Sequence, residues 1–186
     1  MNYFTGGSHF SDEGVIHDKL RPYKSSSEMN TQIINRWNYQ AKRGDTIYHL
    51  GNFITYPDIQ IRHSVSYWYD GLRAVQSILA GVVMITGEQE NRFIAQEFGN
   101  DFESFRDYCR HLGFVDVRRR VKLEIPDLGS ITLGGYDKTD KESVQFIAET
   151  GRRNFNPNAI ELSCDNNNFN LYSENDLVKK FCRRKG

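Results

Sequence analysis

The sequence predicts an α/β protein in which buried strands alternate with amphipathic helices. Residues 46–50 form a short apolar, β-branched and aromatic run after a helical segment, and residues 81–86 repeat this order after a second helical segment. Such runs are typical of strands in the centre of a sheet, and apolar residues three and four apart are typical of helices that cover it. The length of 186 residues suits one domain, 1–186, with a single core.

The composition argues against several classes of protein. Lys and Arg together number 24, as do Asp and Glu, so the formal net charge is zero, whereas a general nucleic-acid or membrane binder normally has a basic excess. Three widely spaced cysteines, Cys109, Cys164 and Cys182, match no zinc or disulfide pattern. No stretch approaches eighteen apolar residues. We therefore expect a cytoplasmic protein with idle thiols and no membrane segment.

The first elements are a strand at residues 2–5 and a loop at 6–10. A helix then begins near Ser25, because Ser25 and Glu28 have the spacing of a capping box and an apolar stripe from Met29 to Trp37 follows.

The strand at 46–50 ends at Gly51-Asn52-Phe53, after a tight turn at 43–45. In open α/β sheets ligands bind at the carboxyl ends of strands, so this corner is a candidate site. The segment 54–66 contains a proline and has no clear period, which predicts a surface loop.

The middle of the chain predicts a helix at 67–79 and a central strand at 81–86. Two further helices are expected at 91–99 and 101–112, the second with Asp101 as its N-cap and Gly113 as its stop.

The last third predicts a strand at 130–133 and another near 159–164. Residues 141–150 fit a helix or a strand equally well. Ser173 and Asp176 have the spacing to cap a final helix.

Several local motifs resemble the small calcineurin-like metallophosphoesterases often encoded by phages and bacteria. The likeness includes F-T-x-x-x-H-F-x-x-E-x-x-I at residues 4–16, the Arg-Pro pair at 21–22 and G-D-T-x-Y-H-L-G at 44–51, and it spans nearly the whole chain in the same order. The resemblance implies a four-layer α/β/β/α sandwich of two packed mixed sheets flanked by helices. It also implies that the strands at 2–5, 46–50, 81–86 and 130–133 end at one cleft.

Family members of this kind hold two metal ions, but this chain lacks most of the side chains that would bind them. By the resemblance, the positions of the family's metal-binding and catalytic side chains are held here by Gly7, His9, Asn52, Glu88, Gln89 and Gly135. Asn52 stands at the metal-bridging Asp and Gln89 at the catalytic His. The family's final pair of histidines is absent from residues 147–153. Two close dications need bridging carboxylates, so the usual metal centre should not assemble.

We therefore expect a non-catalytic, phage-encoded member of this fold, located in the host cytoplasm, with no catalytic residue and no cofactor. It would act as a binding or structural protein through a protein partner or self-association. The side chains that would still ligate a metal are His9, Asn52 and Glu88.

Two other hypotheses stay open. One is a phosphodiesterase or phosphomonoesterase with a rebuilt site for a single Mg or Mn ion, drawn from Glu88, Glu90, Asp137 and Glu149. The other is nucleic-acid contact through the basic segments 118–122 and 179–185 with the nearby aromatics Phe155 and Phe181.

Overall fold

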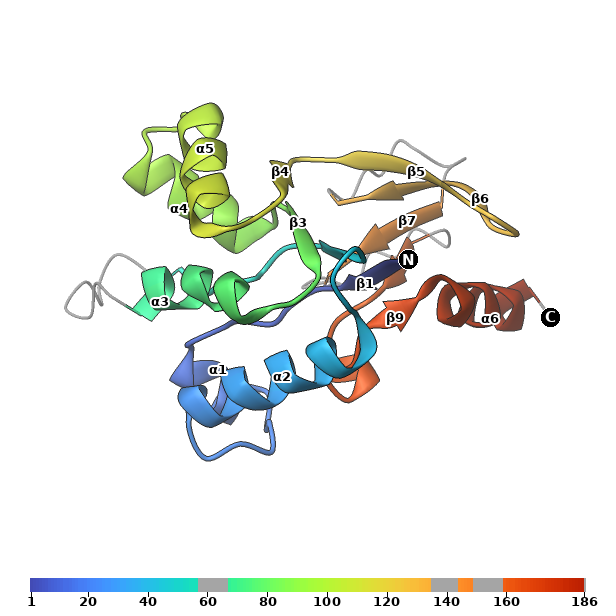
Figure 1. Cartoon of the computed structure of the whole chain (residues 1–186), viewed down its shortest axis with the longest axis horizontal. Coiled ribbons are helices and arrows are strands. Elements are labelled where there is room, and N and C mark those ends of the chain that lie inside the picture. Colours follow the sequence, from blue (N-terminus) through green and yellow to red (C-terminus); the bar gives the residue numbers. More distant parts are fainter. Residues whose placement is uncertain (57–66, 135–143, 149–158, 186) are drawn as a thin grey trace.

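The computed structural model describes residues 1–56, 67–134, 144–148 and 159–185, and these form a mixed α/β fold on two sheets (Figure 1). The first sheet has the strand order β4-β3-β2-β1-β9. Its strands are β1 (Asn2–Thr5), β2 (Thr46–His49), β3 (Gly81–Ile85), β4 (Asp116–Arg118) and β9 (Tyr172–Ser173). β1 to β4 are parallel and β9 is antiparallel to β1.

The second sheet has the order β5-β6-β7-β8. It contains β5 (Val121–Ile125), β6 (Gly129–Leu133), β7 (Val144–Ile147) and β8 (Ala159–Glu161). β5 and β6 form an antiparallel hairpin, while β7 is parallel to β6 and to β8. The segment 141–150, which fitted helix or strand, therefore contains a strand in its described part.

Three of the described helices begin at their predicted caps, and the helix at Glu13–Asp18 has no counterpart among the predicted elements. The helices are α1 (Glu13–Asp18), α2 (Ser26–Gln40), α3 (Tyr67–Arg73), α4 (Glu88–Glu97), α5 (Phe102–Leu112) and α6 (Glu174–Lys185), with short 3₁₀ turns η2 (Ala74–Ser77) and η3 (Asp165–Asn167). The predicted caps are confirmed: Ser25, Asp101 and Ser173 each accept a backbone N–H from the residue three positions later. Gly113 ends α5 with φ 117°, a left-handed conformation that favours glycine.

Three local predictions are wrong in detail. The helix expected at 67–79 tightens into the 3₁₀ turn η2 after Arg73. The helix expected at 91–99 begins at Glu88, because Glu90 reaches back to accept the N–H of Gly87 at 2.8 Å. Ile54 and Tyr56 are buried in the core, so the start of the segment 54–66 is not a surface loop; residues 57–66 lie outside the described part.

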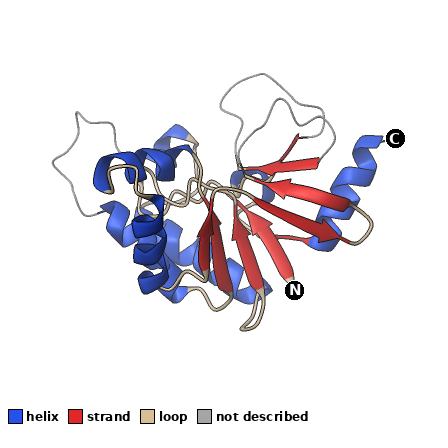
Figure 2. Cartoon of the chain, turned by 90° about the horizontal axis from the view of Figure 1, so that it is seen from above, coloured by secondary structure: helices blue, strands red, loops and turns tan. Residues whose placement is uncertain are grey.

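Each face of the first sheet covers a separate core. One core lies against the helices and includes Met29, Trp37, Ile47, Phe53 and Phe93. The other lies between the sheets and includes Phe4, Ile85, Ile131 and Phe146, together with Leu177 of α6. Figure 2 shows most of the helices gathered on one side of the strands, with α6 near the C-terminus on the other. Among the described helices, none has the length and apolar character that a membrane crossing needs.

Candidate functional site

The loops after β1, β2 and β3 meet at one edge of the first sheet. Gly7 donates its N–H to the carbonyl of Gly51 at 2.9 Å, and His9 donates its N–H to the carbonyl of Asn52 at 3.0 Å. A Cβ at Gly51 would lie 2.6 Å from both N and Cα of Gly87, so the second and third loops touch through their backbones. The structure therefore brings Gly7, His9 and Asn52 together with the start of α4.

β6 of the second sheet reaches the same edge. A Cβ at Gly134, which follows β6, would lie 2.2 Å from Cγ2 of Ile85 at the end of β3. The carboxyl ends of these four strands thus converge, as the resemblance implies. Three candidate residues, Gly135, Asp137 and Glu149, lie outside the described residues.

Glu90 is the centre of the hydrogen bonds that hold this edge. Its side chain is fully buried, and its carboxylate accepts backbone N–H groups from Gly87 at 2.8 Å, Asn52 at 2.9 Å and Phe53 at 2.7 Å, with a longer contact of 3.4 Å to Ile54. Such charge-assisted bonds are stronger than bonds between neutral groups. The N-terminus of α4 also favours a negative charge at this place. The carboxylate of Glu90 is therefore engaged by the backbone of two loops.

The two neighbouring candidates on α4 face different surroundings. The Oε1 atom of Gln89 accepts the N–H of Tyr56 at 3.0 Å, so this side chain supports the loop after β2. The side chain of Glu88 is 71% exposed and pairs with Nη2 of Arg92 at 2.6 Å, one turn further along α4. The partners of these two side chains are therefore Tyr56 and Arg92, and His9 is a partner of neither.

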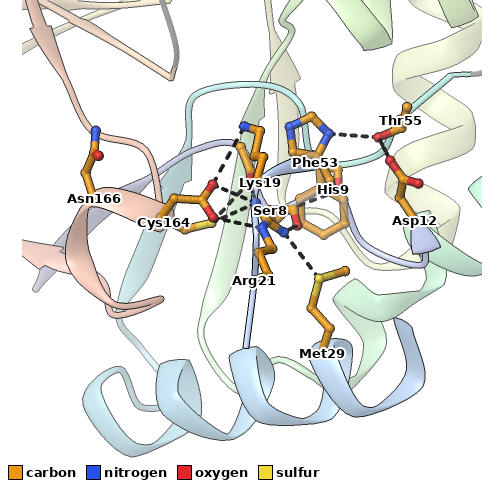
Figure 3. A network of polar contacts seen from close by, with 12 residues as sticks. Ser8, His9, Asp12, Lys19, Arg21, Met29, Phe53, Thr55, Cys164 and Asn166 are labelled. Carbon is orange, nitrogen blue, oxygen red and sulfur yellow. Dashed lines mark hydrogen bonds and ion pairs between the residues drawn. The ribbon is translucent and has the colours of Figure 1, made fainter. Parts of the chain in front are cut away.

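His9 is held by a chain of polar side chains (Figure 3). The hydroxyl of Thr55 donates to Oδ2 of Asp12 at 2.6 Å, so it must accept the Nδ1–H of His9 at 2.8 Å. The proton of neutral His9 therefore lies on Nδ1. Oδ1 of Asp12 meanwhile accepts the N–H of Gly14 and caps α1.

The backbone at the candidate edge has an uncommon conformation at two residues. His9 and Asn52 have φ angles of 52° and 54°, in the left-handed region that few residues other than glycine adopt. Such conformations persist only where the surroundings hold them, and they cluster at active sites, ligand clamps and switch regions.

Beneath these loops His49 forms a buried pair with Ser8. The hydroxyl of Ser8 donates to the carbonyl of Phe53 at 3.1 Å, so it receives the Nε2–H of His49 at 3.0 Å. Nδ1 of His49 has no hydrogen-bond partner among the described residues. Burial, with a smaller contribution from His9, lowers the pKa of His49 to about 3, so its imidazole is neutral near pH 7.

Arg21 is a structural residue that sequence reasoning did not single out, although the Arg-Pro motif contains it. Its side chain is fully buried and binds both carboxylate oxygens of Asp165 at 2.8 Å. It also donates to the carbonyls of Gly7 and Ser8, each at 2.7 Å. Figure 3 shows how this guanidinium ties the loop after β1 to the segment that follows β8.

Several of the described residues have side chains of the types that bind metal ions. Among them, no group of three or more His, Cys, Asp or Glu side chains is placed to hold a metal ion. The carboxylate of Glu90 is engaged by backbone N–H groups, and Glu88 lies on the exposed surface of α4. Glu88 and Glu90 are the two residues of the predicted Mg or Mn site that the structure describes, and Asp137 and Glu149 lie outside the described residues.

The basic segment 118–122 is partly neutralised. Arg118 donates to Asp116, which also binds Arg106, and the guanidinium of Arg119 stacks over the ring of Phe102 at 4.5 Å. In the other basic segment, Lys180 lies over the ring of Tyr172. Phe155 and the side chain of Phe181 lie outside the described part of the chain.

The structure describes the side chains of two of the three cysteines. Cys109 and Cys164 are free and buried, and burial raises the pKa of the Cys109 thiol, which keeps it protonated. The side chain of Cys182 is outside the described part.

Comparison of the sequence with family models and with curated proteins finds no match. Among solved structures, the chain is similar to AQ665, a protein of unknown function from Aquifex aeolicus. The two share a TM-score of 0.64 and 16% sequence identity, over 97% of this chain and 98% of the other. A likeness at this identity shows a shared fold and carries no statement about function.

Proposed function

We propose that this chain is a non-catalytic protein of the calcineurin-like metallophosphoesterase fold, phage-encoded, with the four-layer sandwich of that fold. It acts by binding another protein or a second copy of itself. The observation that carries this proposal is the use of Glu90 and Gln89, which hold the loop after β2 through its backbone N–H groups. By the resemblance, these residues stand in the motif that carries catalytic groups in the family.

The chemistry of the edge supports this proposal. A two-metal hydrolase needs anionic side chains that hold two cations close together and make a hydroxide between them. Asn52 is neutral and Gly7 has no side-chain ligand. The backbones of Gly51 and Gly87 are already in contact at the point where the second and third loops meet.

The network around the edge gives a reason for the fold to persist without catalysis. Arg21, Glu90 and Gln89 hold three loops and a C-terminal segment in fixed positions. A rigid set of loops on a stable scaffold is suited to recognition, because little conformational entropy is lost when a partner binds.

Hydrolysis assays test the absence of catalysis. The purified chain, supplied with Mn²⁺, Mg²⁺ or Ni²⁺, should not hydrolyse bis-p-nitrophenyl phosphate or p-nitrophenyl phosphate faster than a heat-denatured control. The matched variant is His9→Ala, which removes the imidazole at the edge. Metal-dependent turnover that His9→Ala abolishes would show that the site is catalytic and would refute the proposal.

A further inference from the structure

β5 is an edge strand of the second sheet. Among the described residues it pairs with β6, and its other side continues to no described strand. In Figure 1 it runs along the upper margin, on the opposite side of the molecule from α1 and α2. An edge strand presents backbone N–H and carbonyl groups that can pair with another strand.

The side chains of β5 divide between its two faces. Val121, Leu123 and Ile125 face the core between the sheets, and the first two are only half-buried. Lys122 and Glu124 are exposed on the other face. Across the ladder, Lys122 lies opposite Thr132 and Glu124 lies opposite Ser130, so β6 offers neither of them an opposite charge. Within the described residues, neither Lys122 nor Glu124 forms an ion pair.

Proteins commonly protect an edge strand with charges that repel a second copy. On β5, by contrast, the charges of Lys122 and Glu124 attract a second copy of the strand in one arrangement. When two β5 strands pair antiparallel about a two-fold axis through Leu123, each Lys122 lies opposite the Glu124 of the other copy. Opposite charges at directly facing positions stabilise an antiparallel pair.

In the same register, the apolar residues of one β5 strand lie opposite the apolar residues of the other. Val121 then lies opposite Ile125 of the second copy, and the two Leu123 residues face each other. This places half-buried apolar groups against apolar groups, and it leaves charged groups on the outer face of the joined sheet.

The other registers are unfavourable. An axis through Lys122 places Lys122 opposite its own copy, and an axis through Glu124 places two glutamates together. An axis between two neighbouring residues from Val121 to Glu124 puts Lys122 opposite an apolar residue, because a slip of one residue exchanges the faces of a strand. Of these registers, only the axis through Leu123 satisfies both faces.

We propose that β5 is a self-association surface, and that two copies of this chain join through antiparallel β5 strands about Leu123 into one continuous sheet. The pairing is isologous, because the same patch serves both copies, so the assembly closes as a dimer. This inference rests on the proposed function, which includes self-association. It adds the surface, β5, and the partner, a second copy of the chain.

Sedimentation velocity on charge-reversed variants tests the inference. The unmodified chain should sediment as a dimer at tens of micromolar. Lys122→Glu and Glu124→Lys should each sediment as monomers, because each places like charges opposite each other. The double variant Lys122→Glu/Glu124→Lys restores opposite charges and should restore the dimer. Lys24→Glu, with the same charge change at an exposed site before α2, is the matched control and should remain dimeric.

Three results would overturn the inference: a monomeric unmodified chain, a dimer unaffected by the single reversals, or a double variant that stays monomeric. Circular dichroism of each variant shows whether it has folded, and all of the substituted side chains are exposed. A monomer without phosphoesterase turnover would refute this interface and leave the non-catalytic assignment standing. Metal-dependent turnover by a dimer would refute the assignment and leave the interface standing.

Discussion

Glu90 and Phe53 are joined by a hydrogen bond of 2.7 Å between the buried carboxylate of α4 and the backbone N–H of the loop after β2. The same carboxylate binds Asn52 and Gly87, so one side chain fixes the relation between two strand ends. The loop after β2 is therefore held by a carboxylate from outside the loop.

Glu90→Gln should destabilise the fold by about 2–4 kcal/mol. The amide has one acceptor oxygen in place of two, so at least one buried backbone N–H loses its partner, and the remaining bonds lose their charge assistance. Urea unfolding followed by fluorescence measures this change. Glu88→Gln is the control, because it alters an exposed ion pair worth about 0–1 kcal/mol. Equal losses in the two variants would contradict the role given to Glu90.

Gly51→Ala should lower the free energy of unfolding by about 3 kcal/mol or more. The φ of Gly51 is 99°, and the added Cβ would lie 2.6 Å from the backbone of Gly87. Gly44→Ala separates the two causes. Gly44 has φ 92° but no atom within 4 Å of the added Cβ, so this variant should show only the backbone strain of about 1–2 kcal/mol. Thermal or chemical unfolding of the two variants checks the difference. Equal losses would mean that the second and third loops are not in close contact.

His49→Leu should change how stability depends on pH. In the folded chain the pKa of His49 is lowered to about 3 from its ordinary value of 6.5, so below that ordinary value the unfolded chain binds a proton that the folded chain does not. His49 therefore lowers the free energy of unfolding as pH falls from about 6.5 toward about 3, by up to about 1.4 kcal/mol for each pH unit.

Urea unfolding at a series of pH values between these limits measures the effect of His49. As pH falls, the free energy of unfolding of the unmodified chain should decrease more than that of His49→Leu. Any excess stability of the unmodified chain should therefore shrink, and the variant should become the more stable of the two if the initial difference is small. His17→Gln removes an exposed histidine and should keep the pH dependence of the unmodified chain. Parallel curves for the unmodified chain and His49→Leu would show that His49 is not held neutral by burial.

The sequence by itself determined the α/β class, the main strands and several helix ends, because these depend on local signals. Ser25 and Asp101 begin helices, Gly113 ends one, and apolar runs mark β2 and β3. It also placed Gly7, His9 and Asn52 at strand ends, and parallel strands bring their ends to one edge of a sheet.

Only the tertiary structure decided what the polar side chains at that edge do. Glu90 and Gln89 follow a strand as cleft residues would, but their partners are backbone groups 33 to 38 residues away in the chain. Arg21 looks like an ordinary charged residue in the sequence, and in the folded chain it is buried and paired with Asp165, 144 residues later. Such long-range contacts leave no periodic signal in the sequence, because they depend on how the loops are brought together by the packing of the two sheets and the helices.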